Sequence, residues 1–340
     1  MEDVLKIELL RIVQAIEFPS SSAVTFAGQT AQITGVTDPV FRTTAPSPLV
    51  AQLQQLLYDS CYCHRFNGAV APAPKSSTDA DPGFIESLSA ANASRDRWDQ
   101  GWQILQILQT GQIVTVKGAI TRTVWPGEFI TDGAPGVPPR PGAAIRLFAT
   151  RESRDLQPGF YFAFGETLTD QEDEFSIVRL YWHVHASGAS RLINSLTESL
   201  NRFTIPFRFK CLSFPALYDR TDAAVLYIAK RYYRIVANLL VKIYPTARPF
   251  LKSGTPLFTK SLAHGLGLAE SPKTGESFGM SRCRMVAQAA CDSHLRGADT
   301  PEERLSEVAK AFAEVGISLD RPFLNPRSVD QYEFRESCAK

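Results

Sequence analysis

The apolar residues of this chain follow a helical spacing at its beginning and the spacing of strands further on. Over residues 1–17 they recur every three or four positions, which predicts an amphipathic helix with one buried face. A second helix is predicted from about Pro48 to Cys63. The stretches 18–48 and 69–85 are rich in polar residues and proline, so they are expected to be loops.

From Gly101 apolar and polar residues begin to alternate, which is the pattern of strands. The runs WQILQIL and QIVTVKGAITRTV predict a hairpin that turns near Thr110 and Gly111. Residues 126–142 hold five prolines and four glycines, so they are expected to form a long loop. Five later runs have strand character: AAIRLFAT, GFYFAFGE, FSIVRLYWHV, IPFRFKCLSF and AAVLYIA.

Helical spacing returns in the second half of the chain, at residues 188–203, 230–244, 281–295 and 301–315. The last of these helices begins with Thr300 and Pro301 and has Glu303 at the position that a capping box requires. The elements do not repeat as strand–helix–strand units, so the expected fold class is α+β. We expect a mostly helical N-terminal subdomain, an α+β domain with a mixed sheet and flanking helices, and a tail, at residues 1–100, 101–330 and 331–340.

Positive charge is concentrated in residues 201–290. This block holds 14 Lys or Arg and four Asp or Glu, whereas the whole chain carries a net charge of only +1. Because the cations are interleaved with apolar runs, we expect the block to be folded and to hold an anion. The near-neutral total argues against general nucleic-acid binding. No membrane-spanning run, secretory signal or dense cysteine framework is evident, so a cytoplasmic protein without a membrane partner is expected.

The strand IPFRFKCLSF places two cations, Arg208 and Lys210, on one face. One interpretation is that both side chains simply face solvent. The turn that follows favours another role, because a carboxylate such as Asp222 can hold the Arg220 guanidinium rigidly and leave its other edge to a phosphate. The alternative is that Arg220 and Asp222 pair only to tie the turn.

The segment ESFGMSRCRMV begins a helix, with Ser277 or Ser281 as its N-cap. Arg282 and Arg284 lie in the first turn, where the helix dipole disfavours cations. Either both side chains extend into solvent, or the helix start and the arginines share one anion. Lys260 lies between apolar residues and a glycine-rich bend, where it is either a surface lysine or a candidate base.

Other motifs give weaker signals. GESFG matches the G-x-S-x-G pattern of hydrolases but follows a loop rather than a strand, so a serine hydrolase that uses Ser277 is a minor alternative. His183 and His185 alternate on one strand without a third clustered ligand, which is too little for a metal site. The chain has no P-loop and neither of the kinase motifs H-R-D and D-F-G. We therefore expect no metal and no other cofactor.

A set of motifs spread along the chain is shared with a known family. They are LSAANASRDRWDQGWQIL, LTESLNRFTIPFRFKCLSFPALYDRTDAAVLY, PLFTKSLAHGLGLAE, ESFGMSRC and RPFLNP. Together they resemble the HopA-type family, which was first named for a plant-pathogen type III effector and is also associated with enzymes that mature ribosomally made peptides. The resemblance covers roughly residues 45–330 and is most specific from Asn201 to Cys283.

The resemblance implies a lyase that works with a separate aminoglycoside-phosphotransferase-like kinase in class V lanthipeptide and thioamitide pathways. The kinase phosphorylates Ser or Thr of a precursor peptide, and the HopA-like partner eliminates the phosphate to leave dehydroalanine or dehydrobutyrine. The implied partners are therefore the phosphorylated precursor peptide and the kinase. The effector branch of the family implies an alternative, a non-catalytic adaptor that binds a phosphorylated or acidic partner protein.

Such an elimination needs a base for the α-proton, cations for the phosphate and an acid for the leaving group. Lys210 or Lys260 is the expected base, and Lys210 is preferred because its strand adjoins the Arg220 turn. Tyr218 or a histidine is the expected acid. The other expected roles are phosphate contacts from Arg220, Arg282, Arg179 and Arg284, and orienting contacts from Asp222 and Ser277.

Overall fold

The computed structural model describes residues 2–335, except 21–22, 31–46, 71–80 and 134–135. The loops expected at 18–48 and 69–85 lie partly outside these residues. Where the first of them is described, it contributes strands to a small antiparallel sheet, so the expectation of a loop was wrong there. These strands are β1 (Ile16–Ser20), β2 (Ala23–Phe26) and β3 (Gln29–Thr30).

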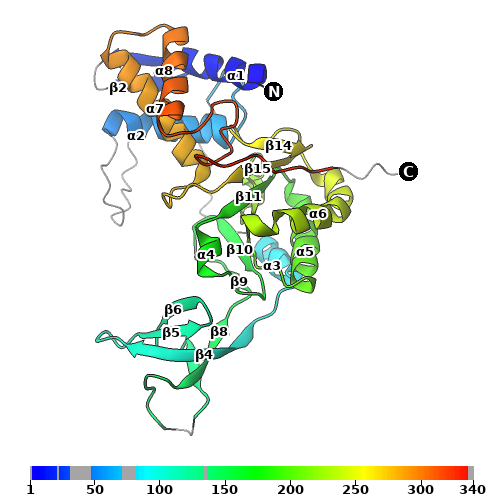
Figure 1. The fold of residues 1–340 in the computed structure, drawn as a ribbon. Helices are drawn as coiled ribbons and strands as arrows, with labels where there is room; N and C mark the ends of the chain where they lie inside the picture. Colours follow the sequence, from blue (N-terminus) through cyan, green and yellow to red (C-terminus); the bar gives the residue numbers. More distant parts are fainter. Residues whose placement is uncertain (1, 21–22, 31–46, 71–80, 134–135, 336–340) are drawn as a thin grey trace.

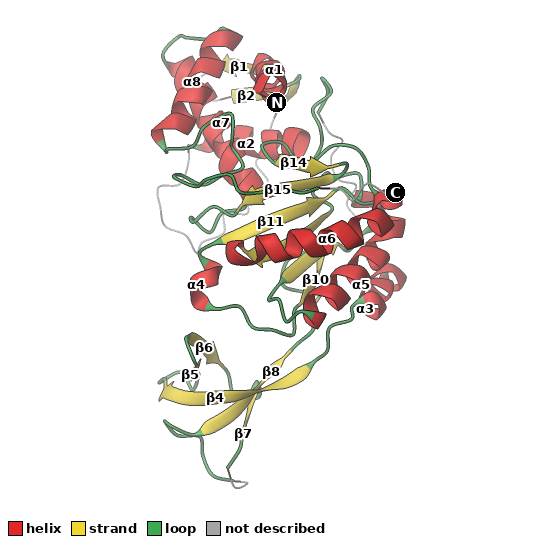
Figure 2. Ribbon diagram, turned by 45° about the vertical axis from the view of Figure 1, so that its right-hand side comes forward, coloured by secondary structure: helices red, strands yellow, loops and turns green. Residues whose placement is uncertain are grey.

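The centre of the molecule is a seven-stranded sheet (Figure 2). Its strands lie in the order β14-β15-β11-β13-β12-β10-β9, and every neighbouring pair is antiparallel. Antiparallel pairing together with flanking helices confirms the expected α+β class. The bounds are β9 (Glu152–Ser153), β10 (Phe160–Phe164), β11 (Ile177–Trp182), β12 (Arg208–Leu212), β13 (Ala224–Ala229), β14 (Lys260–Ala263) and β15 (Leu266–Glu270).

Three helices cover one face of this sheet, and α5 packs against both α3 and α6 (Figure 2). The apolar stripe of α5 is buried as its helical spacing predicts, with Leu192, Leu196 and Leu200 removed from solvent. The bounds are α3 (Pro82–Ala91), α5 (Ala186–Arg202) and α6 (Tyr233–Ala247).

The opposite face meets α7 and the π-helical turn η1, which extends α2. The ring of Tyr181 on β11 lies 6.3 Å from that of Tyr62 in η1 and 6.4 Å from that of Phe278 at the start of α7. Gly279 permits this close packing, because a Cβ at that position would collide with the Tyr62 ring. The bounds are α2 (Pro48–Leu57), η1 (Tyr58–Tyr62) and α7 (Phe278–Leu295).

Segments from the two ends of the chain pack together, with α1 (Glu2–Gln14) against α8 (Pro301–Glu314) (Figure 1). The expected capping box of Thr300 and Glu303 is present at the start of α8. Residues of α1, α2 and the seven-stranded sheet share one hydrophobic core, so the first hundred residues do not pack as a separate unit. No helix among the residues that the structure describes has both the length and the apolar character needed to cross a bilayer.

A second, five-stranded sheet projects from this body (Figure 1). It has a small hydrophobic core of its own. The expected turn near Thr110 and Gly111 joins β4 to β5, whereas β7 lies inside the loop expected at 126–142. The strand order is β6-β5-β4-β8-β7. The bounds are β4 (Arg97–Ile107), β5 (Ile113–Lys117), β6 (Ile120–Val124), β7 (Phe129–Thr131) and β8 (Ala144–Ala149).

Candidate functional site

Strand register sets two rows of side chains across the sheet face that α7 and η1 meet. In the first row, register partners on β12, β13 and β11 are Arg208, Tyr227 and Arg179. In the second row they are Lys210, Val225 and Tyr181. Register partners, and residues two apart on one strand, share a face of a sheet. The backbone pairing alone therefore brings three cations and two tyrosines together.

Arg179 and Arg208 lie against the same aromatic ring. Their guanidinium carbons are 5.4 and 4.7 Å from the centroid of the Tyr227 ring. Arg179 also donates hydrogen bonds from Nε and Nη2 to the Ser271 hydroxyl, at 3.0 and 2.8 Å. These cation–π contacts and hydrogen bonds hold two like charges side by side.

Lys210 and Arg220 share a second ring, that of Phe160 on β10. The Lys210 ammonium lies 4.1 Å and the Arg220 guanidinium carbon 5.9 Å from its centroid. Lys210 Nζ also donates to the side-chain oxygen of Gln157 at 3.2 Å. The turn after β12 thus returns Arg220 to the strand that carries Lys210, as the sequence predicted.

Asp222 fixes the plane of the Arg220 guanidinium. Nε and Nη2 of Arg220 donate to the two oxygens of Asp222 at 2.8 and 2.9 Å. Asp222 is buried, and burial alone would raise the pKa of its carboxyl, but the charge and hydrogen bonds of Arg220 hold that pKa below its ordinary value. The Tyr58 hydroxyl of η1 lies 3.5 Å from Arg220 Nη2. The pair therefore keeps Arg220 charged and leaves Nη1 for another anion.

We call Arg179, Arg208, Lys210 and Arg220 the cation cluster. Within the described part of the chain, Arg220 is the one member that forms an ion pair with an acidic residue. Three cations therefore lack a carboxylate partner. A phosphate monoester carries about two negative charges at neutral pH and accepts several hydrogen bonds, so it matches such a site.

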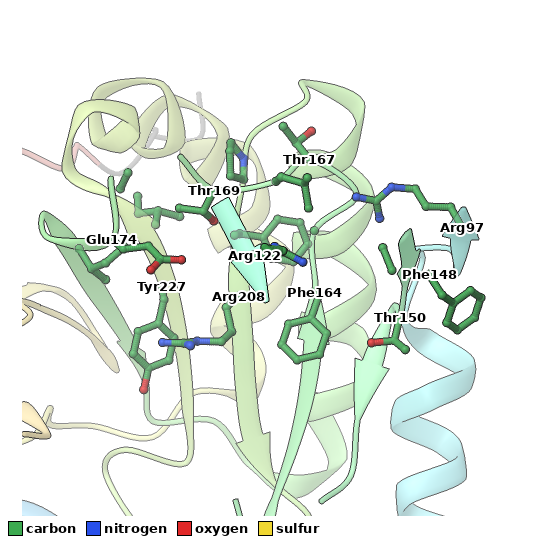
Figure 3. Close-up of a pocket in the computed structure, with 18 residues that line it drawn as sticks. Arg97, Arg122, Phe148, Thr150, Phe164, Thr167, Thr169, Glu174, Arg208 and Tyr227 are labelled. Atoms are coloured by element: carbon green, nitrogen blue, oxygen red, sulfur yellow. The ribbon is translucent and has the colours of Figure 1, made fainter. Parts of the chain in front are cut away.

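A pocket of about 490 Å³ opens beside the cation cluster (Figure 3). Phe164, Arg208 and Tyr227 of the seven-stranded sheet line one side of it. Arg97 and Arg122 of the five-stranded sheet line another side. The cluster therefore borders a space large enough for part of a peptide.

A family model described as the HopA1 effector protein family matches residues 151–324. This chain belongs to the HopA1 effector protein family. The matched segment holds all four members of the cation cluster and runs from β9 to beyond α8. It leaves out β4–β8, so the five-stranded sheet lies outside the part that the family model describes.

Two solved structures are similar to this HopA1-family chain. One is an effector protein from Pseudomonas syringae pv. tomato strain DC3000, at 20% identity, with 83% of this chain and 92% of the other covered and a TM-score of 0.47. The other is an effector protein from Pseudomonas syringae pv. syringae strain 61, at 17% identity, with 80% and 89% covered and a TM-score of 0.43. Comparison with curated proteins gives no match.

Lys260 and Tyr218 lie away from the cation cluster. Lys260 pairs in register with Leu268, which pairs with Leu180, so it faces the side of the sheet opposite to Arg179. Its ammonium donates to both oxygens of Asp330 at 2.8 and 2.7 Å. The expectation that Lys260 could be an alternative base is therefore corrected, because its ammonium lies on the other side of the sheet and is bound to Asp330.

The Tyr218 side chain stabilises the turn in which it lies. Its buried hydroxyl donates to the carbonyl of Leu212 at 2.7 Å, and its ring meets Phe84 of α3 on the helix-covered face. Burial raises the pKa of this hydroxyl far above its ordinary value. The expected role of Tyr218 as an acid is corrected for these reasons.

The arginines at the start of α7 have structural partners. Arg282 is buried, and it donates from Nε and Nη2 to the carbonyls of Pro322 and Leu324 at 2.8 and 3.1 Å. Burial lowers the pKa of its guanidinium to about 10. Arg284 pairs with Glu276 at 3.1 Å. Neither guanidinium belongs to the cation cluster, although Arg282 packs on Phe278, which lies next to Tyr181.

Ser277 caps α7, as one sequence alternative predicted. Its hydroxyl accepts a hydrogen bond from the backbone nitrogen of Met280 at 3.2 Å. His294 lies near the other end of this helix, about 25 Å away at the rise of an α-helix, and pairs with Asp299. A hydrolase triad of Ser277 with His294 is therefore ruled out. The orienting contact expected from Ser277 is made to the backbone of α7 and not to a member of the cation cluster.

Several residues of the site carried no assigned role in the sequence analysis, among them Arg208, Tyr227 and Tyr58. Arg208 was already expected on the Lys210 face, and its alternation with Lys210 is the signal that could have added it. The place of Tyr227 between two arginines depends on the register of three strands. Tyr58 reaches the site from η1, which is 162 residues from Arg220 along the chain. No local pattern signals such a contact.

Proposed function

We propose that this HopA1-family protein is a phospho-Ser/Thr lyase that acts on a kinase-phosphorylated precursor peptide. The product is dehydroalanine or dehydrobutyrine, formed during the maturation of a ribosomally made peptide. One observation carries the proposal: four cations converge on one sheet face, and three of them have no acidic partner in the described structure. Such a site suits a doubly charged phosphate.

Lys210 is the member of the cluster suited to be the base. Guanidinium groups do not give up their protons in proteins, whereas a lysine amine can accept one. In the proposed step the Lys210 ammonium first gives a proton to solvent, and the resulting amine takes the α-proton of the phosphorylated residue. The electron pair of the broken C–H bond forms the Cα–Cβ double bond, and the Cβ–O bond breaks so that phosphate leaves with its electron pair.

The three arginines would neutralise the departing phosphate. Arg220 has one edge bound to Asp222, and Arg179 has Nε and Nη2 bound to Ser271. Arg208 is exposed at the border of the pocket, where an incoming peptide would meet it first. Preorganised cations that face developing charge lower the barrier more than mobile ones do.

The test is mass spectrometry of a phosphothreonine peptide incubated with the purified protein. We expect loss of phosphoric acid, and a decrease in rate of roughly 10²–10³-fold in Arg220→Ala, as for other oxyanion-stabilising groups. Arg284→Ala is the matched control, since its ion pair with Glu276 lies outside the cluster. A wild-type protein that retains the phosphopeptide but never eliminates would support the adaptor alternative and contradict the lyase.

A further inference from the structure

The pocket beside the cation cluster has a charge pattern of its own. Arg97, Arg122 and Arg208 reach it from β4, β6 and β12, and Figure 3 shows their side chains around the same space. Among its lining residues Glu174 is the one acid. Arg208 extends across the ring of Tyr227, with Glu174 nearby in the same view (Figure 3). The lining thus carries three positive charges and one negative charge.

Two of these three arginines have no acidic partner among the residues that the structure describes. Arg122 and Arg208 form no ion pair with any residue that the structure describes; each packs instead on an aromatic ring, that of Trp102 or of Tyr227. Arg97 is partly balanced: it lies 4.0 Å from Asp99, which also binds the ammonium of Lys117 at 2.8 Å, and after Arg95 it helps to hold the pKa of Glu166 below its ordinary value. Aromatic packing orients a guanidinium without satisfying its charge, so the pocket is prepared for an anion.

The spacing between the pocket and Lys210 matches the repeat of an extended peptide. Arg208 and Lys210 are two residues apart on β12 and share a face, which separates them by about 7 Å along the strand. Side chains two residues apart on an extended peptide have the same separation. An extended substrate that runs along β12 with its phosphorylated residue at Lys210 would therefore place a residue two positions away at Arg208, over the pocket.

We propose that this pocket is a specificity subsite that binds an anionic side chain two residues from the reacting phosphoserine or phosphothreonine. The inference rests on the proposed lyase function and adds the class of substrate. Arg97 and Arg122 would hold this second anion, while Arg208 lies at the border between the subsite and the reacting phosphate. A carboxylate and a second phosphate share the chemistry that guanidinium groups recognise. Arg97 and Arg122 belong to the five-stranded sheet, so the preference would depend on a part of the chain outside the matched residues 151–324.

The test uses phosphothreonine peptides that differ at one position, two residues before or two residues after the phosphothreonine. That position carries Glu, phosphoserine or the neutral isostere Gln. We expect kcat/KM for elimination to be at least tenfold higher with Glu or phosphoserine than with Gln on one of the two sides. The comparison of Glu with phosphoserine shows which anion the subsite prefers.

Arg122→Gln should reduce the Glu-to-Gln ratio of kcat/KM to near one. Arg140→Gln is the matched control, because Arg140 is an exposed arginine in the loop between β7 and β8 and does not line this pocket, and it should keep the ratio. Equal elimination of all three peptides by the wild type would overturn the subsite and leave the lyase standing.

Binding of the same peptides, measured by fluorescence anisotropy, separates the two proposals. If no peptide is eliminated, the lyase fails, and the subsite then stands only if the wild type binds the Glu peptide at least tenfold more tightly than the Gln peptide. A similar Kd for both peptides would overturn the subsite in that case too.

Discussion

Asp222→Asn tests the arrangement on which the site depends. The substitution keeps the shape of the side chain but removes the charge that faces the Arg220 guanidinium across hydrogen bonds of 2.8 and 2.9 Å. Asp222 is 5% exposed, so little solvent is present to replace the lost charge. Arg220 would keep one hydrogen bond, to the amide oxygen of Asn, and would lose the other.

The cost can be estimated from the burial of the two side chains. Removing one partner of a fully buried ion pair destabilises a protein by about 3–5 kcal/mol. Here one hydrogen bond survives and the Arg220 side chain is 20% exposed. We therefore expect the free energy of unfolding at pH 7 to fall by about 2–3 kcal/mol. The rate of elimination should fall as well, because Arg220 loses its fixed orientation.

The pH dependence has a defined sign. The pKa of Asp222 is lowered in the folded protein from an ordinary value of 3.8, so its contribution to stability is complete above that pH. The contribution decreases as the pH falls below 3.8 and is lost once the pH passes the folded-state pKa. The difference between wild type and Asp222→Asn should therefore be largest at pH 7 and shrink below about pH 4.

Urea unfolding at pH 7 and pH 3 measures this difference. Asp219→Asn is the matched control, because Asp219 lies in the same turn with its side chain 60% exposed, and it should change the free energy of unfolding by about 0.5 kcal/mol or less. Equal stability of Asp222→Asn and wild type at pH 7 would refute the reasoning. A difference that stays constant down to pH 3 would refute it too.

Two further predictions concern cations outside the cluster. Lys260→Ala should leave the rate of elimination unchanged. It should lower the free energy of unfolding by about 1 kcal/mol or less, because the ion pair of Lys260 with Asp330 is partly exposed. A folded Lys260→Ala variant that no longer eliminates phosphate would show that Lys260 belongs to the site. Arg282→Ala should lower the free energy of unfolding by about 2–4 kcal/mol, measured in urea, because two buried carbonyls lose their donor. Arg284→Ala is its control at about 1 kcal/mol or less, and equal costs for the two variants would contradict the assigned contacts.

Short-range features of the fold could be predicted from the sequence. The capping box at Thr300 and Glu303 depends on residues three positions apart, and it is present. The turn near Gly111 depends on one local signal and is also present, with Gly111 at a φ of +85°. Arg220 and Asp222 are two residues apart, so their pairing was foreseen from the turn alone. In each case the residues that interact lie within a few positions of one another, so the local sequence is enough to determine the conformation.

Other strands were missed because glycine interrupts their alternation. The run QIVTVKGAITRTV was expected to be one strand, but Gly118, at a φ of +56°, divides it into β5 and β6. Gly265, at a φ of +67°, turns the chain between β14 and β15 in the same way. A side chain at Gly265 would also collide with the carbonyl of Lys252, a contact that no local pattern shows.

The partners of the other candidate cations could not be predicted, because they come from distant parts of the chain. Lys260 reaches Asp330, 70 residues away, and Arg282 reaches carbonyls 40 and 42 residues away. Charge spacing in the sequence identified these residues as cations near apolar runs. Tertiary packing decides whether each cation finds an internal partner or faces an open surface. Arg282 finds buried carbonyls, whereas Arg208 lines the pocket.

The central claim is that the amine of Lys210 removes the α-proton of a phosphorylated residue held by the surrounding arginines. The most direct measurement is mass spectrometry of a phosphothreonine peptide deuterated at its α-carbon, incubated with the wild type and with Lys210→Ala. The account predicts loss of the deuteron together with phosphate in the wild type, and neither event in Lys210→Ala, which should still bind the peptide. Elimination by Lys210→Ala at the wild-type rate would contradict it.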